Sequence, residues 1–445
     1  MTVAERIDCN ALRARFARAL SRMYRAEVPA YGTLVSLVED VNAATLDRDR
    51  SLAERLRATG GLDRISEERH GAIRLGTAAE LAGMGRLFAG FGMAPVGYYD
   101  LGVAGIPVHS TAFRPIGEAD LAISPFRVFT SLLRTEAIAD ERLRREAEHA
   151  LEQRSIFHGR TLALADRSVW KGGLCEREAD ELIDGAVETF RWRGGAAVGA
   201  DIYASLKDVH ALIADVVSFA GPHINHLTPR TLDIDAVQRL MPERGVRPKA
   251  VVEGPPPRDV PILLRQTSFK AIEERVAFPD GAGGTVPGAH TARFGEVEQR
   301  GAALTPKGRA LYDRLLAAAR QAVRPAPDGS NAAEYDDALR ATFTEFPDDT
   351  HAMEAEGLAY FRYDRVEGRR VATPIVYEDF LPISAAGIFQ SNLGDDVSDI
   401  SARSARASFE RALGAPVLDE FALYAARERD SLERCGADGR VHARG

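Results

Sequence analysis

EERHGAIRLG at residues 67–76 and TAAELAGMGRLFAGFG at residues 77–92 open the stretch of sequence that decides the fold. The first segment alternates like a short strand, and the second has the spacing of a helix that ends at Gly92. Three more strand-like runs follow between Gly and Pro turns: APVGYYDLG (94–102), IPVHSTAFRPI (106–116) and PFRVFTSLLR (125–134). This order predicts a β-α-β-β-β unit.

The same order of elements recurs later in the chain. INHLTPRTL (224–232) predicts a strand and turn, and DIDAVQRLMPERG (233–245) predicts a helix with an Asp near its start. Three further strands are expected at PKAVVEG (248–254), VPILLRQTSF (260–269) and HTARFGEVEQRG (290–301), the last two separated by a loop, PDGAGGTVPG (279–288). We interpret the two sets as an internal duplication of structure, without sequence identity between the copies.

The remaining segments are predominantly helical. LTPKGRALYDRLLAAARQAV (304–323) predicts a strong helix, and a helical tail is expected from about Ala402 to Glu433. We therefore predict an α+β protein with a catalytic core over residues 1–301, in which repeat units at about 66–135 and 222–301 alternate with helical insertions at 1–60 and 136–220. Residues 302–445 are expected to form a helical and mixed segment that completes the pocket.

Composition excludes several classes of protein. The 445 residues are 45% hydrophobic and carry a net charge of −8 without basic blocks, which argues against a nucleic-acid partner. No run of about 18 apolar residues is present, so we expect no membrane span. Three widely separated cysteines (Cys9, Cys175 and Cys435) and an N-terminus without an apolar signal-peptide core predict a cytoplasmic protein.

Candidate metal ligands are concentrated in GPHINHLTPR (221–230) and FGEVEQRG (294–301), together with His70 of the first copy. His223 and His226 differ by an odd number of residues, so they would face opposite sides of a regular strand and at most one of them is expected to point into the site. Glu296 and Glu298 share a face, and strand period leaves the choice between them open. Two neighbouring carboxylates repel unless a cation or an Arg lies between them.

The pattern of ligands suggests a particular chemistry. Two histidines and one carboxylate with open positions form the facial triad of non-haem Fe(II) oxygenases. The alternative is that these are ordinary residues, because EVEQR could be an exposed edge strand and a single His on a strand is more often structural. We assign five further histidines to that structural class: His109, His158, His210, His290 and His351.

Five strings along the whole chain resemble one known family. They are RHGAIRLGT (69–77), GPHINHLTPRTLDID (221–235), QTSFKAIEE (266–274), RFGEVEQRG (293–301) and YEDFLPISAAGIFQSNLG (377–394). The chain is similar to the 2-oxoadipate dioxygenase/decarboxylase family, also called hydroxyglutarate synthase, within the vicinal-oxygen-chelate superfamily. The resemblance implies that the two β-α-β-β-β units pair into an open barrel of the vicinal-oxygen-chelate type, with large helical additions.

The resemblance also implies a metal and a reaction. Its triad carries over onto His70, His226 and Glu296, since the ligand in related enzymes stands three residues before a Gln-Arg pair. Glu298 is then the alternative ligand or a partner behind the ligands. The implied cofactor is Fe(II), and the implied reaction converts 2-oxoadipate and O2 to 2-hydroxyglutarate and CO2, as in lysine catabolism.

A substrate with a second carboxylate needs a cation, and an Arg fork matches a carboxylate in bidentate geometry. Arg74 shares a face of its strand with His70 and is the first choice, and Arg275 is the second. Gln266 and Ser268 are expected to line the same cavity, while Ile383 and Ser384 are expected to close over the substrate.

Two other functions stay open on the sequence alone. One is a non-redox lyase or isomerase that uses Zn, Ni or Mn on the same scaffold, and the other is a small-ligand binding protein. Oxygen consumption with Fe(II) but not Zn would separate the first from the oxygenase. A complete set of metal ligands argues against the second.

Overall fold

The computed structural model describes residues 6–58, 61–381 and 399–441. The described chain divides into two compact units that interleave along the sequence. Unit 1 comprises the described parts of Met1–Pro229, Phe269–Glu296 and Pro382–Leu418, and unit 2 those of Arg230–Ser268, Val297–Leu381 and Asp419–Gly445. The sequence-based division into residues 1–301 and 302–445 is sequential instead, and it stays a prediction.

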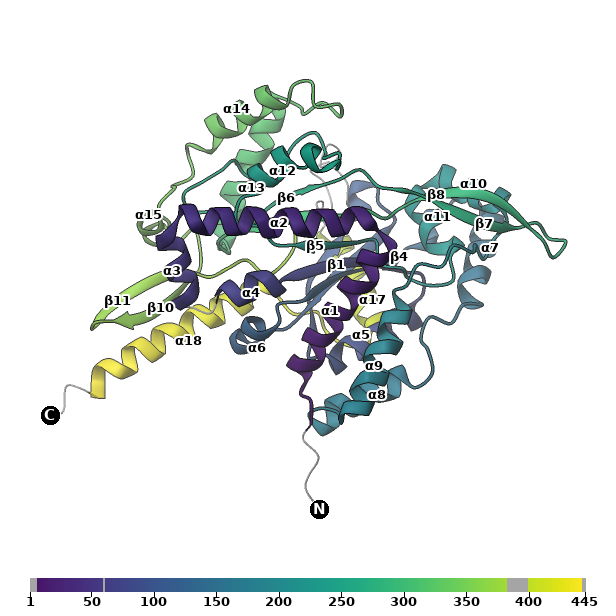
Figure 1. Ribbon diagram of the computed structural model, residues 1–445, viewed down its shortest axis with the longest axis horizontal. Helices are drawn as coiled ribbons and strands as arrows, with labels where there is room; N and C mark the ends of the chain where they lie inside the picture. The colour runs from purple at the N-terminus through teal and green to yellow at the C-terminus, as the bar shows by residue number, and fades with distance from the viewer. Residues whose placement is uncertain (1–5, 59–60, 382–398, 442–445) are drawn as a thin grey trace, which may run out of the picture. The chain divides into compact units, whose positions relative to one another are not determined.

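Unit 1 contains a sheet of five described strands in the order β2-β3-β4-β1-β5. Its strands are β1 (Arg69–Leu75), β2 (Ala94–Asp100), β3 (Val108–Arg114), β4 (Arg127–Leu133) and β5 (His226–Pro229). β1 runs parallel to β4, whereas the other neighbours are antiparallel. With α5 (Ala78–Gly90) between β1 and β2, the first predicted β-α-β-β-β unit is confirmed. β5, from the second copy, extends this sheet at the free edge of β1 (Figure 1).

Local sequence explains why α5 begins and ends where it does. Thr77 and Glu80 form a reciprocal capping box at its start, and Gly92, with φ +67°, follows its end. Near the end of α5, Gly90 lets α8 (Thr161–Lys171) approach closely, since a Cβ there would lie 2.7 Å from the Cα of Ala165. Every residue of β3 and β4 is buried, so the centre of the sheet is covered on both faces.

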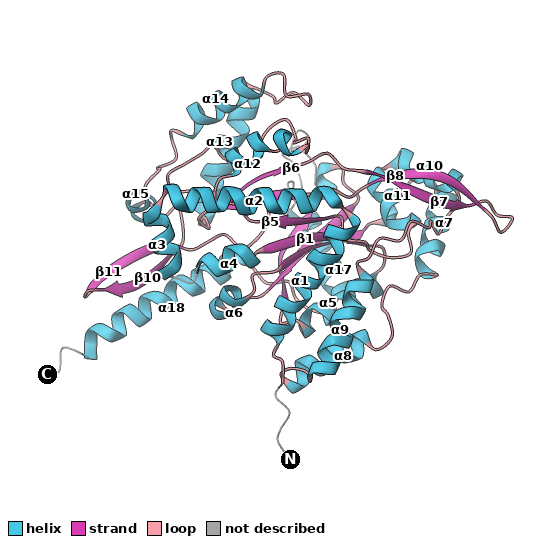
Figure 2. Cartoon of the chain, in the orientation of Figure 1, coloured by secondary structure: helices cyan, strands magenta, loops and turns pink. Residues whose placement is uncertain are grey.

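Helices make up most of the regular structure of unit 1 (Figure 2). The large helical additions expected for the fold are confirmed. The first two helices are separated at Pro29, which occupies the first turn of α2. Besides α5 and α8, the helices are α1 (Cys9–Glu27), α2 (Pro29–Arg48), α3 (Arg50–Ala58), α4 (Gly61–Glu67), α6 (Glu118–Ile123), α7 (Glu141–Glu152), α9 (Glu176–Thr189), α10 (Ala200–Val209), α11 (Ala211–Ser218) and α17 (Asp399–Leu413).

The second copy departs from the expected order. HTARFGEVEQRG was expected to be one strand. Its first two residues instead end β8 (Thr285–Thr291), and a separate strand, β9 (Glu296–Arg300), lies within the rest of the segment. β8 pairs with β7 (Glu273–Pro279), a strand that the sequence did not predict. Of the predicted loop at 279–288, residues 280–284 form the turn of this hairpin, while residues 285–288 belong to β8. Residues 292–295 separate the two strands. At Gly295 the backbone lies so close to the Phe269 ring that a Cβ would be 2.2 Å from it.

PKAVVEG was predicted as a strand, and that prediction is wrong. Its backbone makes only isolated bridges among the described residues, including one between Glu253 and Gln266 of β6 (Leu264–Ser268). Gly254, at φ +109°, and the three prolines after it stop a regular ladder, because proline has no N–H to donate.

Unit 2 has its own core. In it β6 pairs with β9, and β10 (Phe361–Val366) forms a hairpin with β11 (Arg369–Pro374). The core contains Tyr312, Leu315 and Phe343, all nearly inaccessible. The helices of this unit are α12 (Ile234–Leu240), α13 (Pro306–Ala322), α14 (Ala332–Phe343), α15 (Thr350–Ala355) and α18 (Glu420–Val441). The predicted helical tail consists of two helices, α17 and α18, with Gly414 at φ +77° directly after α17.

The α+β class with open sheets is confirmed by these elements. Within the described parts of the chain, no helix combines the length and the apolar character that a membrane crossing requires.

Candidate metal centre

His70, His226 and Glu296 come together in unit 1. Nε2 of His70 lies 3.2 Å from Oε2 of Glu296, and Nε2 of His226 lies 3.4 Å from the same oxygen. The two imidazole rings are perpendicular, with their centroids 5.4 Å apart. All three side chains are buried.

Strand pairing explains how the histidines meet. In the antiparallel ladder of β1 and β5, His70 lies opposite Thr228, and Ala72 lies opposite His226. Residues directly opposite and residues two apart share a face, so both imidazoles and the Thr228 hydroxyl project from the same side. Thr228 Oγ1 donates a hydrogen bond to Oε2 of Glu296, 3.1 Å away, and so orients the carboxylate.

The donor set suits a divalent transition metal. Metal–nitrogen and metal–oxygen bonds of about 2.1 Å place adjacent ligands of an octahedral ion about 3 Å apart. The 3.2 Å and 3.4 Å separations found here are close to that value. Two imidazoles and one carboxylate supply three ligands, which leaves the remaining positions of such an ion to other groups.

Glu298 has a different environment from Glu296. Its two oxygens accept from Nε and Nη2 of Arg300 at 2.6 and 2.9 Å, and both side chains are fully buried in unit 2. Arg300 also donates to the carbonyls of Tyr377 and Asp379. Arg300 therefore supplies the cation that is expected where the carboxylates of Glu296 and Glu298 are neighbours on one strand, and it pairs with Glu298.

Among the described residues, a second group of possible ligands in unit 1 consists of Asp215, His223 and His290. His223 thus joins a different cluster from His226. His223 lies before β5, so the alternation of side chains along a strand does not apply to it directly. Even so, the two histidines belong to different groups, in agreement with the expectation that at most one of them joins the metal site. His290 was assigned to the structural class by sequence, and no local pattern indicates its neighbours, because Asp215 lies 75 residues away in sequence.

Arg74 lies beside this second group. Its Nη1 donates to Oδ2 of Asp215 at 2.6 Å, and its side chain is 19% exposed. Arg74 and His70 lie on the same face of β1, as the strand period predicts. In the parallel ladder of β1 and β4, Arg127 lies opposite His70. Arg127 forms a fully buried ion pair with Glu68 at 2.8 Å.

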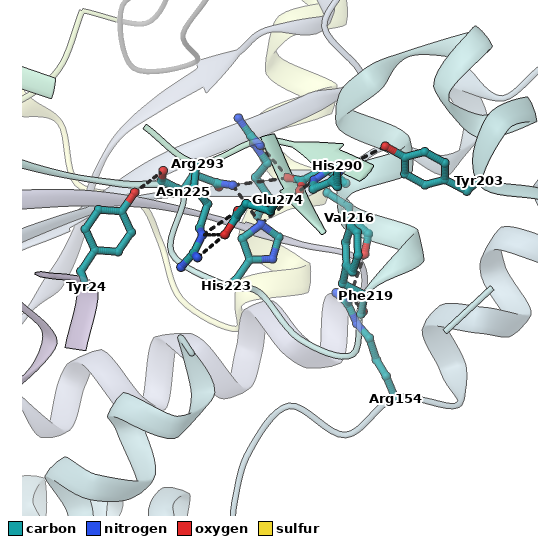
Figure 3. A network of polar contacts seen from close by, with 12 residues as sticks. Tyr24, Arg154, Tyr203, Val216, Phe219, His223, Asn225, Glu274, His290 and Arg293 are labelled. Carbon is teal, nitrogen blue, oxygen red and sulfur yellow. Dashed lines mark hydrogen bonds and ion pairs between the residues drawn. The ribbon is translucent and has the colours of Figure 1, made fainter. Parts of the chain in front are cut away.

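Buried polar contacts also fix the segments that carry two of the candidate ligands (Figure 3). The Tyr24 hydroxyl lies 2.9 Å from the carbonyl of Asn225 and 2.7 Å from that of Phe294, residues next to His226 and Glu296. Arg293 forms ion pairs with Glu274 and Glu27, and its guanidinium lies over the Tyr24 ring. α1 is thereby connected to both segments.

Comparison with known proteins decides which family this centre belongs to. The family model described as 2-oxoadipate dioxygenase/decarboxylase matches residues 16–392. A relative of the same description from Pseudomonas putida is 54% identical over 451 residues, covering 96% of this chain and 97% of the relative. The chain belongs to the 2-oxoadipate dioxygenase/decarboxylase family.

Solved structures agree with this assignment to the 2-oxoadipate dioxygenase/decarboxylase family. A crystal structure of hydroxyglutarate synthase in complex with 2-oxoadipate, from Pseudomonas putida, matches with a TM-score of 0.90 at 53% identity and covers 97% of this chain and 98% of that chain. A glyoxalase-superfamily structure from Ralstonia eutropha matches at a TM-score of 0.50 and 21% identity over 66% of this chain and 85% of that chain, which supports the fold alone. The predicted family, fold class and enzyme class are confirmed.

The other predicted site residues of this family member have varied positions. Arg275 is exposed on β7, opposite Ala289 in the hairpin. Gln266 and Ser268 are buried on β6 in unit 2, and the described residues offer no hydrogen-bond partner to the Gln266 amide or to the Ser268 hydroxyl. Ile383 and Ser384 lie outside the described residues. The roles of all five at the substrate site stay predictions.

Proposed function

We propose that this chain is an Fe(II)-dependent enzyme that converts 2-oxoadipate and O2 to 2-hydroxyglutarate and CO2. One substrate carbon leaves as CO2, and the two oxygen atoms of O2 are retained in the products. The observation that carries the proposal is the buried group of His70, His226 and Glu296 in a member of this family.

In this proposal His70, His226 and Glu296 hold the iron. Fe(II) supplies oxygen activation and a template for the 2-oxo carboxylate. Three protein ligands suffice, since a fourth would occupy a position that the substrate or O2 requires. Thr228 keeps the Glu296 carboxylate in its ligating orientation through the hydrogen bond to Oε2.

Arg74 binds the second carboxylate of the substrate. Its guanidinium has donors besides the one that Nη1 gives to Asp215, and its partly exposed side chain allows a ligand to reach them. A 2-oxo acid without the second carboxylate loses this interaction and is expected to bind more weakly.

We also propose a cytoplasmic location. Cys9, Cys175 and Cys435, which all lie in described parts of the chain, are free thiols, as is usual for proteins of a reducing compartment.

Aerobic incubation of iron-loaded protein with a series of 2-oxo dicarboxylates tests the function. We expect O2 uptake, CO2 release and a product with the mass of 2-hydroxyglutarate when 2-oxoadipate is supplied. Protein loaded with Zn is expected to consume no O2. A product without the 2-hydroxy group, or turnover that is equal with Zn, would contradict the proposal.

A histidine variant with a matched control tests the ligands. His70→Ala is expected to lose metal and turnover, whereas His351→Ala, which removes an exposed imidazole, is expected to keep both. Unchanged metal content in His70→Ala would remove this residue from the metal centre.

A further inference from the structure

Asp215 lies at the centre of a buried polar network behind Arg74. It is on α11 and is 4% exposed, and both of its carboxylate oxygens accept hydrogen bonds. Oδ1 accepts from Nε2 of His290 at 2.8 Å and from Nε2 of His223 at 3.1 Å. Oδ2 accepts from Nη1 of Arg74 at 2.6 Å and from the Asn225 amide at 3.4 Å.

A second layer of contacts fixes the imidazole of His290. The Tyr203 hydroxyl lies 3.0 Å from Nδ1 of His290 (Figure 3). The Trp192 ring stacks on the imidazole at 5.9 Å between centroids with 11° between planes. A phenol that donates to Nδ1 leaves the proton on Nε2, which then donates to Asp215. Tyr203 and Trp192 therefore hold Asp215 in place through His290.

The network keeps the Asp215 carboxyl ionised. Burial by itself would raise the pKa of this group, but His223, Arg74 and His290 hold the pKa well below its ordinary value. A buried carboxylate of this kind needs its cation, and Arg74 supplies it. Since the position of Asp215 is determined from several sides, the position of the Arg74 guanidinium follows from it.

We propose that Asp215 is a positioning residue that anchors Arg74 and thereby sets the preference for 2-oxo acids with a second carboxylate. The proposal rests on the proposed function, in which Arg74 binds that carboxylate. An arginine side chain has many rotamers, and an arginine that is held before the substrate arrives loses less freedom on binding. The remaining donors of the guanidinium are then presented in one orientation.

A second metal ion at Asp215, His223 and His290 is the competing interpretation. The contacts argue against it. The imidazoles of His223 and His290 direct Nε2 at one carboxylate oxygen, as those of His70 and His226 do, but here a guanidinium occupies the other oxygen. A divalent cation at this place would face the positive charge of Arg74.

Asp215→Asn tests the positioning role, because it removes the charge of the carboxylate and keeps the size of the side chain. An amide has one oxygen and one NH2 group, while each oxygen of Asp215 faces N–H donors. If the amide oxygen serves His223 and His290, its NH2 group faces Arg74 and repels it. We expect KM for 2-oxoadipate to rise about tenfold with kcat changed less than about threefold.

Selectivity is the readout that a general folding defect would not produce. KM for 2-oxohexanoate, which has the same chain without the second carboxylate, is expected to stay unchanged in Asp215→Asn. Anaerobic titration calorimetry of metal-loaded protein with 2-oxoadipate is expected to show the same roughly tenfold loss of affinity. Asp201→Asn, an exposed acid on α10, serves as the matched control.

A double-variant cycle tests whether Asp215 acts through Arg74. In an Arg74→Met background, adding Asp215→Asn is expected to leave KM for 2-oxoadipate unchanged. If Asp215→Asn does not fold, Tyr203→Phe gives the same test with a smaller expected rise in KM, about threefold, because it removes only the contact with His290.

The outcomes are distinguishable. Wild-type protein that neither binds nor converts 2-oxoadipate overturns the proposed function. Wild-type protein that does both, with Asp215→Asn equal to it in KM and selectivity, overturns only the positioning role. Two metal equivalents per wild-type chain and one in Asp215→Asn would overturn it in favour of a second metal site.

Discussion

At the scale of single residues, two glutamates on one strand have different partners. Glu296 meets His70 and His226, whereas the carboxylate of Glu298 pairs in bidentate fashion with Arg300. Because both side chains are buried, each carboxylate requires compensation for its charge. Because Glu296 lies with the histidines and Glu298 with Arg300, removing the charge of one glutamate is expected to affect metal binding and removing that of the other to affect stability.

Glu296→Gln and Glu298→Gln are a matched pair for this purpose. We expect Glu296→Gln to weaken metal binding by about 100-fold or more with little change in folding. Glu298→Gln is expected to retain metal but to lower the free energy of unfolding by about 3 kcal/mol, because Arg300 loses its buried partner. Metal content after dialysis and urea unfolding measure the two effects. The reverse result would make Glu298 the ligand.

His109 predicts a pH dependence of stability. Burial lowers the pKa of this imidazole on β3 to about 4, with Arg134 contributing in the same direction. The unfolded chain binds a proton near the ordinary pKa of about 6.5, while the folded chain does not. Stability is therefore fully present above about pH 6.5 and falls by about 3 kcal/mol as the pH drops towards 4.

Urea unfolding of the metal-free protein at pH 7 and pH 5 measures this effect. His109→Gln is expected to lose less stability between the two pH values than the wild type does. His351→Gln, at an exposed position, is expected to behave like the wild type. An equal loss of stability between pH 7 and pH 5 in all three proteins would contradict the assignment to His109.

At the scale of elements, the close contact of β1 and β5 sets the position of His226. A Cβ at Gly71 of β1 would lie 2.6 Å from Cδ1 of Ile224 and 3.1 Å from the carbonyl of His226. The second contact is with backbone, which cannot move without moving β5. β5 is only four residues long, so its ladder with β1 is short.

Gly71→Ala is therefore expected to lower the free energy of unfolding by about 1–3 kcal/mol and to weaken metal binding together with it. Gly195→Ala is the control, because nothing lies within 4 Å of a Cβ at that position. Calorimetric melting and metal titration of both variants measure the effects. Normal metal affinity in a destabilised Gly71→Ala would show that β5 does not set the position of the ligand.

At the scale of the whole molecule, the metal centre connects distant parts of the chain. His70 and Glu296 are 226 residues apart in sequence. The unfolded chain does not hold such ligands together, so metal binding favours the folded state. At a free metal concentration of about 100 times Kd the stabilisation is about 2.7 kcal/mol.

Removal of the metal with a chelator is accordingly expected to lower the melting temperature, and readdition of Fe(II) under anaerobic conditions is expected to restore it. In Glu296→Gln the melting temperature should depend much less on metal, because the variant binds it about 100-fold more weakly. A wild-type melting temperature that is independent of metal would mean that the proposed ligands bind none.

The sequence by itself determined the first β-α-β-β-β unit, the large helical additions and the family. Local periodicity, capping residues such as Thr77 and breaks such as Pro29 act within a few residues, so they can be recognised without the fold. The candidate ligands were also predicted, through the resemblance of short strings. Strand parity alone left Glu296 and Glu298 equivalent.

Only the tertiary structure decided how the second copy divides its strands and which polar groups meet. β5 completes the sheet of the first copy, and the hairpin of β7 and β8 separates β6 from β9 in sequence. Arg300 is the partner of Glu298, and Asp215 collects Arg74, His223 and His290. Periodicity shows which side of a strand is buried, but the partners of a buried charge come from distant segments that only the folded chain brings together.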